Sequence, residues 1–337
     1  MAETTRAPMF TSRWRGVADV PHGLLSDRNI GYILAAAAAA ESRTSYPSSS
    51  GRMRLPIIHV SGLGFPEGPV LLGEGGIAFV DLFDQKIRIY RDGAARDLCV
   101  VDGSPNGMRL GPDGALYVAN NGGLSPRPGR GPVFIEPQIT GRIQRVTLDG
   151  VRSDFAVRLP GEAPWRPNDL VFTDRGEIVF TEPQNWEDLS RKRAGLPYTP
   201  YRGGQLLLAR RDGTVAHLAK LTGFPNGLAF HPDGSLIVGL TIEHCLLRLA
   251  WFGDRVGEPQ MWLRFDDGFF PDGMVFHDDQ LYVTGSDGDR IAVVNLDGDV
   301  VEMIPTPPGS VPTNLCVEGR TLWVTFGISG QLAAYDL

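Results

Sequence analysis

Apolar residues gather in six short runs that are rich in β-branched and aromatic side chains. A run of roughly 4–8 such residues bounded by turn residues is typical of a β-strand. Each run lies about ten residues after a stretch in which Pro is followed by a polar residue. The Pro stretches are FPEGPV from Phe65, SPNGMRL from Ser104, RPNDLVF from Arg166, FPNGLAF from Phe224, FPDGMVF from Phe270 and VPTNLCV from Val311. The strand-like runs are GGIAFVD, GALYVAN, GEIVFTE, GSLIVGL, DQLYVTG and RTLWVTF, in the same order.

The spacing of these copies predicts the fold. Counted at the polar residue, successive copies lie 39, 62, 58, 46 and 42 residues apart. The shorter spacings match the roughly 40–50 residues of a β-propeller blade, which has four antiparallel strands. The longer ones carry Gly- and Pro-rich insertions, residues 120–137 and the stretch after Glu182. Helical periodicity is absent from residue 56 onward. We therefore expect an all-β, six-bladed β-propeller over residues 55–337; a pair of β-sandwich domains would not produce six copies of one motif.

Residues 1–54 differ in composition and are expected to form an N-terminal extension, partly helical or flexible. An Ala-rich segment over residues 29–43 predicts a short helix, and a Ser-rich linker follows it. The Ala block resembles the apolar region of a signal peptide, but it starts late and after polar sequence. We therefore favour a segment that packs on the propeller or mediates homo-oligomer formation, in a cytoplasmic protein.

Charge and hydropathy limit the classes of binding partner, and the cysteine count indicates the state of the thiols. The formal net charge is −7 and no basic run stands out, which argues against nucleic-acid binding. No apolar run reaches the roughly 18–20 residues of a membrane span. The three cysteines, an odd and sparse set, indicate buried free thiols rather than a disulfide framework.

The polar residue after Pro occupies what we call the slot of each copy. The slot residues are Glu67, Asn106, Asn168, Asn226, Asp272 and Asn314. Because the innermost strands of a propeller line its central channel, residues at their starts meet at one mouth. Two carboxylates and two amides, from Glu67, Asn168, Asn226 and Asp272, would form an all-oxygen set that suits Ca²⁺, with Mg²⁺, Mn²⁺ or Zn²⁺ as substitutes. The alternative is that these residues only form turns, since Asn and Asp before Gly are common there. Glu67, a poor turn former, weighs against it.

The motifs FPEGPV, RPNDLVF, FPNGLAF and FPDGMVF resemble the SMP-30/gluconolactonase/luciferin-regenerating-like family over about residues 56–337. The resemblance implies a six-bladed propeller with a divalent cation in the channel, held by the same four residues. It also implies that Asp272 is the general base or nucleophile and that Arg166 contacts substrate. The family usually has FTDP where this chain has FTEP, so Glu182 carries a longer side chain at the expected pocket rim.

Further residues are expected near the mouth as substrate contacts. Asn106 occupies a slot that the family does not use for metal, Trp165 would supply an apolar wall, and loops after the second strands would bring Asn120, Glu182 and His244. For each of these loop residues a solvated surface position is the competing interpretation. His244 is also a second candidate base, because some lactonase propellers use histidine.

These residues predict a metal-dependent hydrolase that opens a small lactone, of sugar type or another type. A water molecule would attack the ester carbonyl with Asp272 accepting its proton, or the Asp272 carboxylate would attack directly. An enzyme acting on organophosphorus or other esters, and a non-catalytic ligand-binding propeller, are the alternatives.

Overall fold

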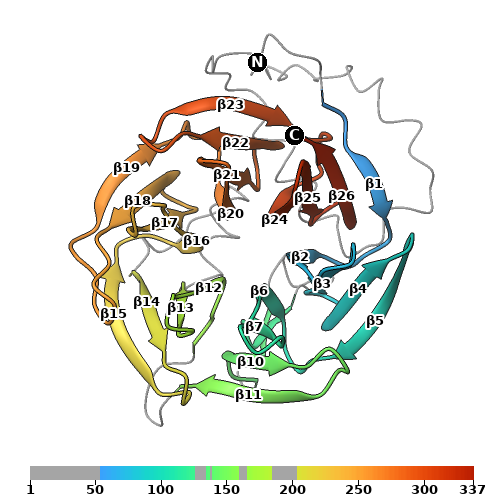
Figure 1. The fold of residues 1–337 in the computed structure, drawn as a ribbon, viewed down its shortest axis with the longest axis horizontal. Helices are drawn as coiled ribbons and strands as arrows, with labels where there is room; N and C mark the ends of the chain where they lie inside the picture. The colour runs from blue at the N-terminus through green and yellow to red at the C-terminus, as the bar shows by residue number, and fades with distance from the viewer. Residues whose placement is uncertain (1–53, 126–133, 137–138, 159–164, 184–202) are drawn as a thin grey trace, which may run out of the picture.

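The computed structural model describes residues 54–125, 134–136, 139–158, 165–183 and 203–337. The expected Ala-rich helix, nearly all of the expected extension and much of both insertions lie outside these residues. Within them, six four-stranded antiparallel sheets stand around a central axis (Figure 1). The prediction of a six-bladed β-propeller is confirmed. No helix in the described part of the chain is long and apolar enough to cross a lipid bilayer.

Each blade contributes one strand to each of four concentric positions, and we number the blades 1 to 6 from β2 onward. The innermost strands are β2 (Pro66–Leu71), β6 (Pro105–Leu110), β12 (Leu170–Phe172), β16 (Pro225–Phe230), β20 (Pro271–His277) and β24 (Pro312–Glu318). The second strands are β3 (Ile77–Asp81), β7 (Leu116–Asn120), β13 (Ile178–Glu182), β17 (Leu236–Leu240), β21 (Gln280–Gly285) and β25 (Thr321–Phe326). The third strands are β4 (Lys86–Arg91), β10 (Arg142–Val146), β14 (Gly204–Ala209), β18 (Cys245–Leu249), β22 (Arg290–Val294) and β26 (Gln331–Asp336). The outermost strands are β5 (Ala94–Val100), β11 (Arg152–Val157), β15 (Val215–Leu221), β19 (Gln260–Arg264), β23 (Val300–Pro305) and β1 (Ile57–Val60).

Blade 6 is built from both ends of the propeller sequence. Strand β1 pairs antiparallel with β26, with Ile57 opposite Ala334. The fourth strand of the last blade therefore comes from the start of the domain, and the ring is closed by backbone hydrogen bonds (Figure 1). Closure of this kind leaves only short, protected sheet edges.

The apolar runs are continuous because both faces of each blade are buried. In blade 2, Leu116 and Val118 pack against blade 1, whereas Tyr117 and Ala119, which alternate with them, pack against blade 3. Alternate residues of a strand point to opposite faces, so a strand covered on both sides needs an apolar residue at each position. Among the described residues, one apolar cluster fills each of the six contacts between neighbouring blades.

The cysteines belong to this packing. Cys245 and Cys316 are buried, Cys99 is half-buried, and all are unpaired thiols. Burial raises the pKa of Cys245 to about 11 and that of Cys316 to about 12. These two thiols are therefore protonated and unreactive at neutral pH.

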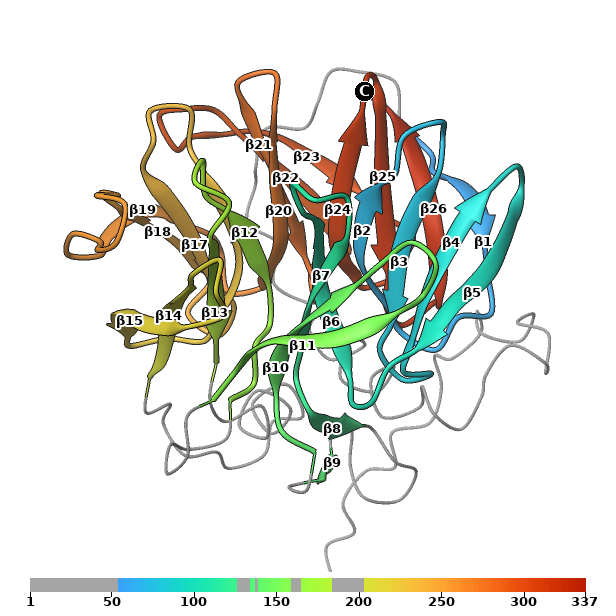
Figure 2. The same cartoon turned by 60° about the horizontal axis from the view of Figure 1, so that its bottom comes forward.

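A two-stranded ribbon marks the end of the ring at which the slots lie. Strands β8 (Gly123–Ser125) and β9 (Phe134–Glu136) pair with each other and project beyond one end of the ring (Figure 2). The ribbon follows Asn120, the residue that pairs with Pro105 beside the slot of blade 2.

Candidate functional site

In blades 1, 2, 4 and 5 the Pro and slot residues lie in a β-bulge of the innermost strand, not in a turn before it, whereas in blade 3 they directly precede β12. In blade 2, Pro105 pairs with Asn120 and Met108 pairs with Val118, so Asn106 and Gly107 together face a single residue. Blades 1, 4 and 5 have a register shift in the same motif. A bulge re-aims side chains and is frequent beside active sites. The turn interpretation of these Asn-Gly and Asp-Gly pairs is therefore wrong.

The register corrects the slot of the sixth copy. Pro312 pairs with Phe326 and Leu315 with Val324, which matches the pairing of Pro105 and Met108 in blade 2. The residue equivalent to Asn106 is then Thr313, and Asn314 takes the position that follows the slot. Thr313 turns its hydroxyl to the Pro66 carbonyl of blade 1, at 2.9 Å.

The residue after the slot is glycine in four blades because the neighbouring blade comes very close. A Cβ atom on Gly227 would lie 2.1 Å from the carbonyl oxygen of Asp272, and one on Gly107 would lie 2.2 Å from Oδ1 of Asp169. Only glycine allows so close a backbone approach. These contacts place the slots of neighbouring blades side by side around the channel.

Threonine hydroxyl groups in the second strands, or directly after one of them, hold the slot backbones in place. Each hydroxyl donates a hydrogen bond to a backbone carbonyl in the slot motif of the next blade: Thr181 to Asn226 at 2.8 Å, Thr241 to Pro271 at 2.7 Å and Thr284 to Thr313 at 2.7 Å. All of these threonines are fully buried. Buried bonds of this kind hold the slot backbones in one arrangement.

The two predicted amide ligands are buried at the channel. Asn226 donates from Nδ2 to Oγ1 of Thr241 at 3.0 Å, which turns its carbonyl oxygen away from Thr241. Asn168 is 2% exposed, and its backbone carbonyl accepts a hydrogen bond from the Gly107 amide at 2.8 Å. The Asn226 side chain is thus oriented by Thr241, and the Asn168 backbone is held by blade 2.

The predicted acidic ligands concentrate negative charge in the channel. Glu67 is only 3% exposed and accepts a hydrogen bond from the Gly68 amide at 2.7 Å. Burial raises the pKa of Glu67 well above its ordinary value, and the carboxylates of Asp272 and Asp169 raise it further. Asp272 is half-buried and so is the more accessible of the two predicted acidic ligands.

Two residues that the sequence did not single out, Asp169 and Arg109, complete this centre together with Asn314. Asp169 is 1% exposed, and its Oδ2 lies 3.3 Å from Nη2 of Arg109 and 3.5 Å from Nδ2 of Asn314. Burial raises the pKa of Asp169, while the Arg109 guanidinium opposes that rise. The signal that could have found them is the departure from glycine after the slot, at Asp169 and, once the register is known, at Asn314.

Two of the predicted substrate contacts, Asn106 and Arg166, lie in or directly before a slot motif. Asn106 is buried and donates from Nδ2 to Oδ1 of Asn121 at 3.1 Å. Arg166 is 9% exposed, and its Nη1 donates to the Trp165 carbonyl at 3.0 Å. A contact of either side chain with substrate stays a prediction.

Three other predicted contacts are fully buried and hold the surrounding backbone. Glu182 accepts hydrogen bonds from the Arg166 amide and from Gln205 Nε2, both at 3.0 Å. Asn120 donates to the Asp102 carbonyl at 2.8 Å, and Trp165 packs on Phe180 with ring centroids 5.8 Å apart. The longer side chain of Glu182 thus supports the backbone of Arg166, and direct substrate contact by these three residues stays untested.

His244 is set in a strained loop between β17 and β18. Its φ is 55°, in the left-handed region, and its ring meets Phe270 edge-on with centroids 4.4 Å apart. Nδ1 lies 3.0 Å from the carbonyl oxygen of Phe269. A carbonyl only accepts, so Nδ1 carries the hydrogen, and Nε2 is the basic nitrogen of the neutral ring.

The donor set fits a divalent cation. In the described residues, no three His, Cys, Asp or Glu side chains cluster in a way that could hold a metal ion. An ion in the channel would therefore need amide oxygens beside carboxylates, and the slots supply both. The Asp272 and Asp169 carboxylates raise the pKa of Glu67, and a nearby cation would stabilise the charged form of such a carboxyl group.

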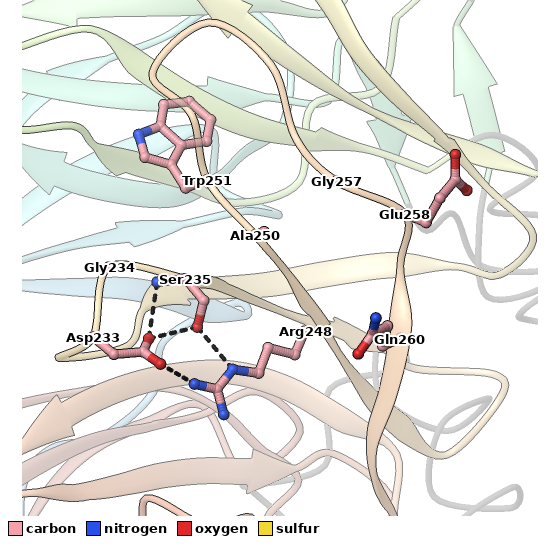
Figure 3. A pocket seen from close by; sticks show the side chains of 9 residues that line it. All are labelled: Asp233, Gly234, Ser235, Arg248, Ala250, Trp251, Gly257, Glu258 and Gln260. Atoms are coloured by element: carbon pink, nitrogen blue, oxygen red, sulfur yellow. Dashed lines mark hydrogen bonds and ion pairs between the residues drawn. The ribbon is translucent and has the colours of Figure 1, made fainter.

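A separate groove lies at the opposite end of blade 4. It has a volume of about 620 Å³ and is bordered by Asp233, Ser235, Arg248 and Trp251 among others (Figure 3). Arg248 is held by Ser235, with Nε 2.9 Å from Oγ, and by Asp233. Arg248 and Asp233 pair with each other, and the groove is remote from the slots because it borders the distal turn of the blade.

Comparisons with known proteins agree with this architecture. A gluconolactonase of Zymomonas mobilis is 26% identical over 234 residues, which span 65% of this chain and 60% of that protein. A gluconolactonase from Xanthomonas campestris has a similar structure, with a TM-score of 0.67 and 22% identity over 88% of this chain and 99% of that one. Regucalcin of Agrobacterium tumefaciens, described as calcium-binding, gives a TM-score of 0.63 and 15% identity over 84% and 93% of the two chains. The sequence profile of the SMP-30/Gluconolactonase/LRE-like region matches residues 65–327, and the chain belongs to this family.

Proposed function

We propose that the protein is a hydrolase that opens a small lactone at the slot end of the channel with the help of a divalent cation, Ca²⁺ in the first place. The observation that carries the proposal is the convergence of Glu67 and Asp272, from blades 1 and 5, on one buried charge centre. The relationship to a gluconolactonase supports a lactone as substrate.

Each residue of the centre has a defined task in this proposal. Glu67, Asn168 and Asn226 would hold the cation together with Asp272. When bound there, the cation would supply Lewis acidity at the carbonyl oxygen of the ester and so stabilise the negative charge that develops on it. Arg166 and Asn106 bind and orient the ring substituents of the lactone.

Asp272 is the residue that we assign to the reacting atoms. It is half-buried, whereas Glu67 is 3% exposed, so substrate entering by the mouth reaches Asp272 first. Asp272 accepts the proton of a water molecule as the water oxygen bonds to the carbonyl carbon. The ring C–O bond then breaks, and the leaving oxygen takes the proton back from Asp272 to give the hydroxy acid. Attack by the Asp272 carboxylate on the carbonyl carbon, with cleavage of the ring C–O bond and hydrolysis of the resulting anhydride, is the alternative route.

His244 offers a second basic group near Asp272. Its ring contacts Phe270, two residues before Asp272, and its Nε2 is the nitrogen that can accept a proton. pH–rate profiles of the two variants separate the assignments. The ionisation of the base should disappear from the profile of Asp272→Asn if Asp272 is the base, and from the profile of His244→Gln if His244 is the base.

The test is a screen of lactones by proton release, run after thorough chelation and after Ca²⁺, Mg²⁺, Mn²⁺ or Zn²⁺ is returned. We expect hydrolysis that EDTA removes and one of these ions restores. Activity that survives full chelation would overturn the cation-dependent mechanism. Hydrolysis of organophosphorus esters alone would reassign the substrate, and ligand binding without turnover would mark the protein as a non-catalytic propeller.

A further inference from the structure

Asn314 occupies a position at which four other blades have no side chain. That position, directly after the slot, is glycine in these blades, at Gly68, Gly107, Gly227 and Gly273. In blade 3 it is Asp169, and in blade 6 it is Asn314. Blade 6 faces blade 3 across the ring and borders blade 1 (Figure 1). Asn314 is 2% exposed, and its Nδ2 lies 3.5 Å from Asp169 Oδ2, so it meets a side chain of the opposite blade inside the channel.

The partners of the Asn314 amide group determine its orientation. Oδ1 accepts a hydrogen bond from the backbone amide of Leu315 at 2.9 Å. The side chain also donates to the Glu67 carboxyl group, and Nδ2 is its only donor atom. A rotated amide would turn its oxygen toward carboxylate oxygens and its nitrogen toward an N–H group. The nitrogen, which cannot coordinate a cation, therefore faces the acids, and Asn314 is suited to orient a ligand and not to be one.

Asn314 gives Glu67 a contact from another blade. The Glu67 carboxylate also accepts a hydrogen bond from the amide of Gly68, but that amide belongs to the same strand. Asn314 is anchored in blade 6 instead, where its backbone amide donates to the fully buried Thr325 hydroxyl at 3.1 Å. Carboxylates that bind metal ions are in turn hydrogen-bonded, and loss of such a partner typically lowers metal affinity by about 10–100-fold.

We propose that Asn314 is a positioning residue of the cation site, which holds the Glu67 carboxylate in the orientation that receives the ion. This inference rests on the cation site of the proposed function. Without the Asn314 donor, the Glu67 side chain would sample further rotamers, and the ion would have to restrict them on binding. Binding should therefore weaken although all four ligands remain.

Isothermal titration calorimetry with Ca²⁺ on the full chain tests this role. Asn314→Ala removes the amide group. Asn314→Gly, which introduces the residue of four other blades, is the second variant if the Ala variant does not fold, as judged by circular dichroism. The matched control is Thr306→Val, which breaks a buried hydrogen bond elsewhere: Thr306 Oγ1 lies 2.9 Å from Ser310 Oγ in the loop between β23 and β24.

We expect the dissociation constant for Ca²⁺ to rise about 10–100-fold in Asn314→Ala and to stay within about threefold of wild type in Thr306→Val. Combining Asn314→Ala with Glu67→Gln shows whether the effect acts through Glu67. Once that ligand is lost, the Asn314 change should alter the constant by less than about threefold, because coupled residues are not additive. If Glu67→Gln binds Ca²⁺ too weakly to titrate, the comparison of Asn314→Ala with Thr306→Val decides.

A folded Asn314 variant that binds Ca²⁺ as tightly as wild type would overturn this inference and leave the cation site in place. An equal loss of affinity in the wild-type and Glu67→Gln backgrounds would also overturn it, because a general disturbance of the channel does not depend on Glu67. Wild-type protein that binds none of Ca²⁺, Mg²⁺, Mn²⁺ and Zn²⁺ would overturn the cation site itself, and this inference with it.

Discussion

Replacing Glu67 by Gln should have opposite effects on the free and the ion-bound protein. In the absence of a cation, the fold must keep this carboxyl group buried beside Asp272 and Asp169, and its pKa is raised well above the ordinary value of 4.5. The neutral, nearly isosteric amide of Gln has no charge to bury and so avoids this destabilisation of the fold. With a cation present, the same change removes a ligand.

The sign of the pH dependence follows from proton linkage. At pH values between the ordinary pKa and the raised folded pKa, the folded state holds a proton that the unfolded state has released. Stability is therefore lost as the pH rises through this window, and each unit of the pKa rise costs about 1.4 kcal/mol. In chelator, Glu67→Gln should unfold at a higher temperature than wild type at pH 8. The difference should shrink toward zero as the pH falls to about 4.5.

Added Ca²⁺ should reverse the order of stability of wild type and Glu67→Gln. A ligand at a concentration of 100 times its dissociation constant stabilises the folded state by about 2.7 kcal/mol. If loss of the Glu67 carboxylate weakens binding by about 100-fold, the same concentration stabilises the variant by only about 0.4 kcal/mol. Wild type should then gain far more from added Ca²⁺ than the variant does.

Thermal unfolding followed by circular dichroism, from pH 5 to pH 8 with EDTA or with Ca²⁺, measures both effects. Glu74→Gln is the matched control, because Glu74 lies in an exposed turn away from the channel. A Glu67→Gln variant that is less stable than wild type in EDTA at pH 8 would refute the burial argument. Equal stabilisation of both proteins by Ca²⁺ would refute the role of Glu67 as a ligand.

Three further changes test the other residues. Asp272→Asn should lower kcat by about 10²–10⁴-fold with the circular dichroism spectrum unchanged; an active variant would exclude Asp272 from the chemistry. Thr241→Val breaks the bond that orients Asn226 and should weaken cation binding by about tenfold in calorimetry. The same change leaves a buried polar group unpaired and should lower the free energy of unfolding by about 1–3 kcal/mol. Unchanged cation binding would show that Thr241 does not support the site. Arg166→Met should raise KM about tenfold with kcat nearly unchanged if Arg166 contributes uniform substrate binding, whereas an equal fall in kcat would indicate a contact made only in the transition state.

The fold was predictable from the sequence because every blade needs the same local pattern. Strands such as β7 pack on both faces, so their apolar runs are unbroken and easy to find. Strand β1 could not be recognised as part of blade 6, because an outermost strand carries no Pro motif and two of its four residues are exposed. Ring closure, not local preference, determines its place.

The site was less predictable because it depends on register and on contacts between distant residues. Thr313 and Asn314 are both polar, and the sixth slot was assigned to Asn314, although Thr313 is the residue that directly follows Pro312. The pairing of Leu315 with Val324 shows that Thr313 occupies the slot. The sequence pattern assigned no role to Asp169 or Arg109. They lie 60 positions apart and meet only because blades 2 and 3 are neighbours.

Few of the positions after a slot have room for a side chain larger than that of glycine, and this limits where functional groups can lie in the channel. A side chain on Gly107 would overlap Asp169, and one on Gly273 would come within 2.3 Å of Asn314. Each polar side chain after a slot thus requires glycine in the preceding blade. Two opposed blades satisfy this condition because glycine precedes each of them, at Gly107 and Gly273. The glycines are therefore as much a requirement of the charged centre as Asp169 and Asn314 are, since they create the space that those side chains fill.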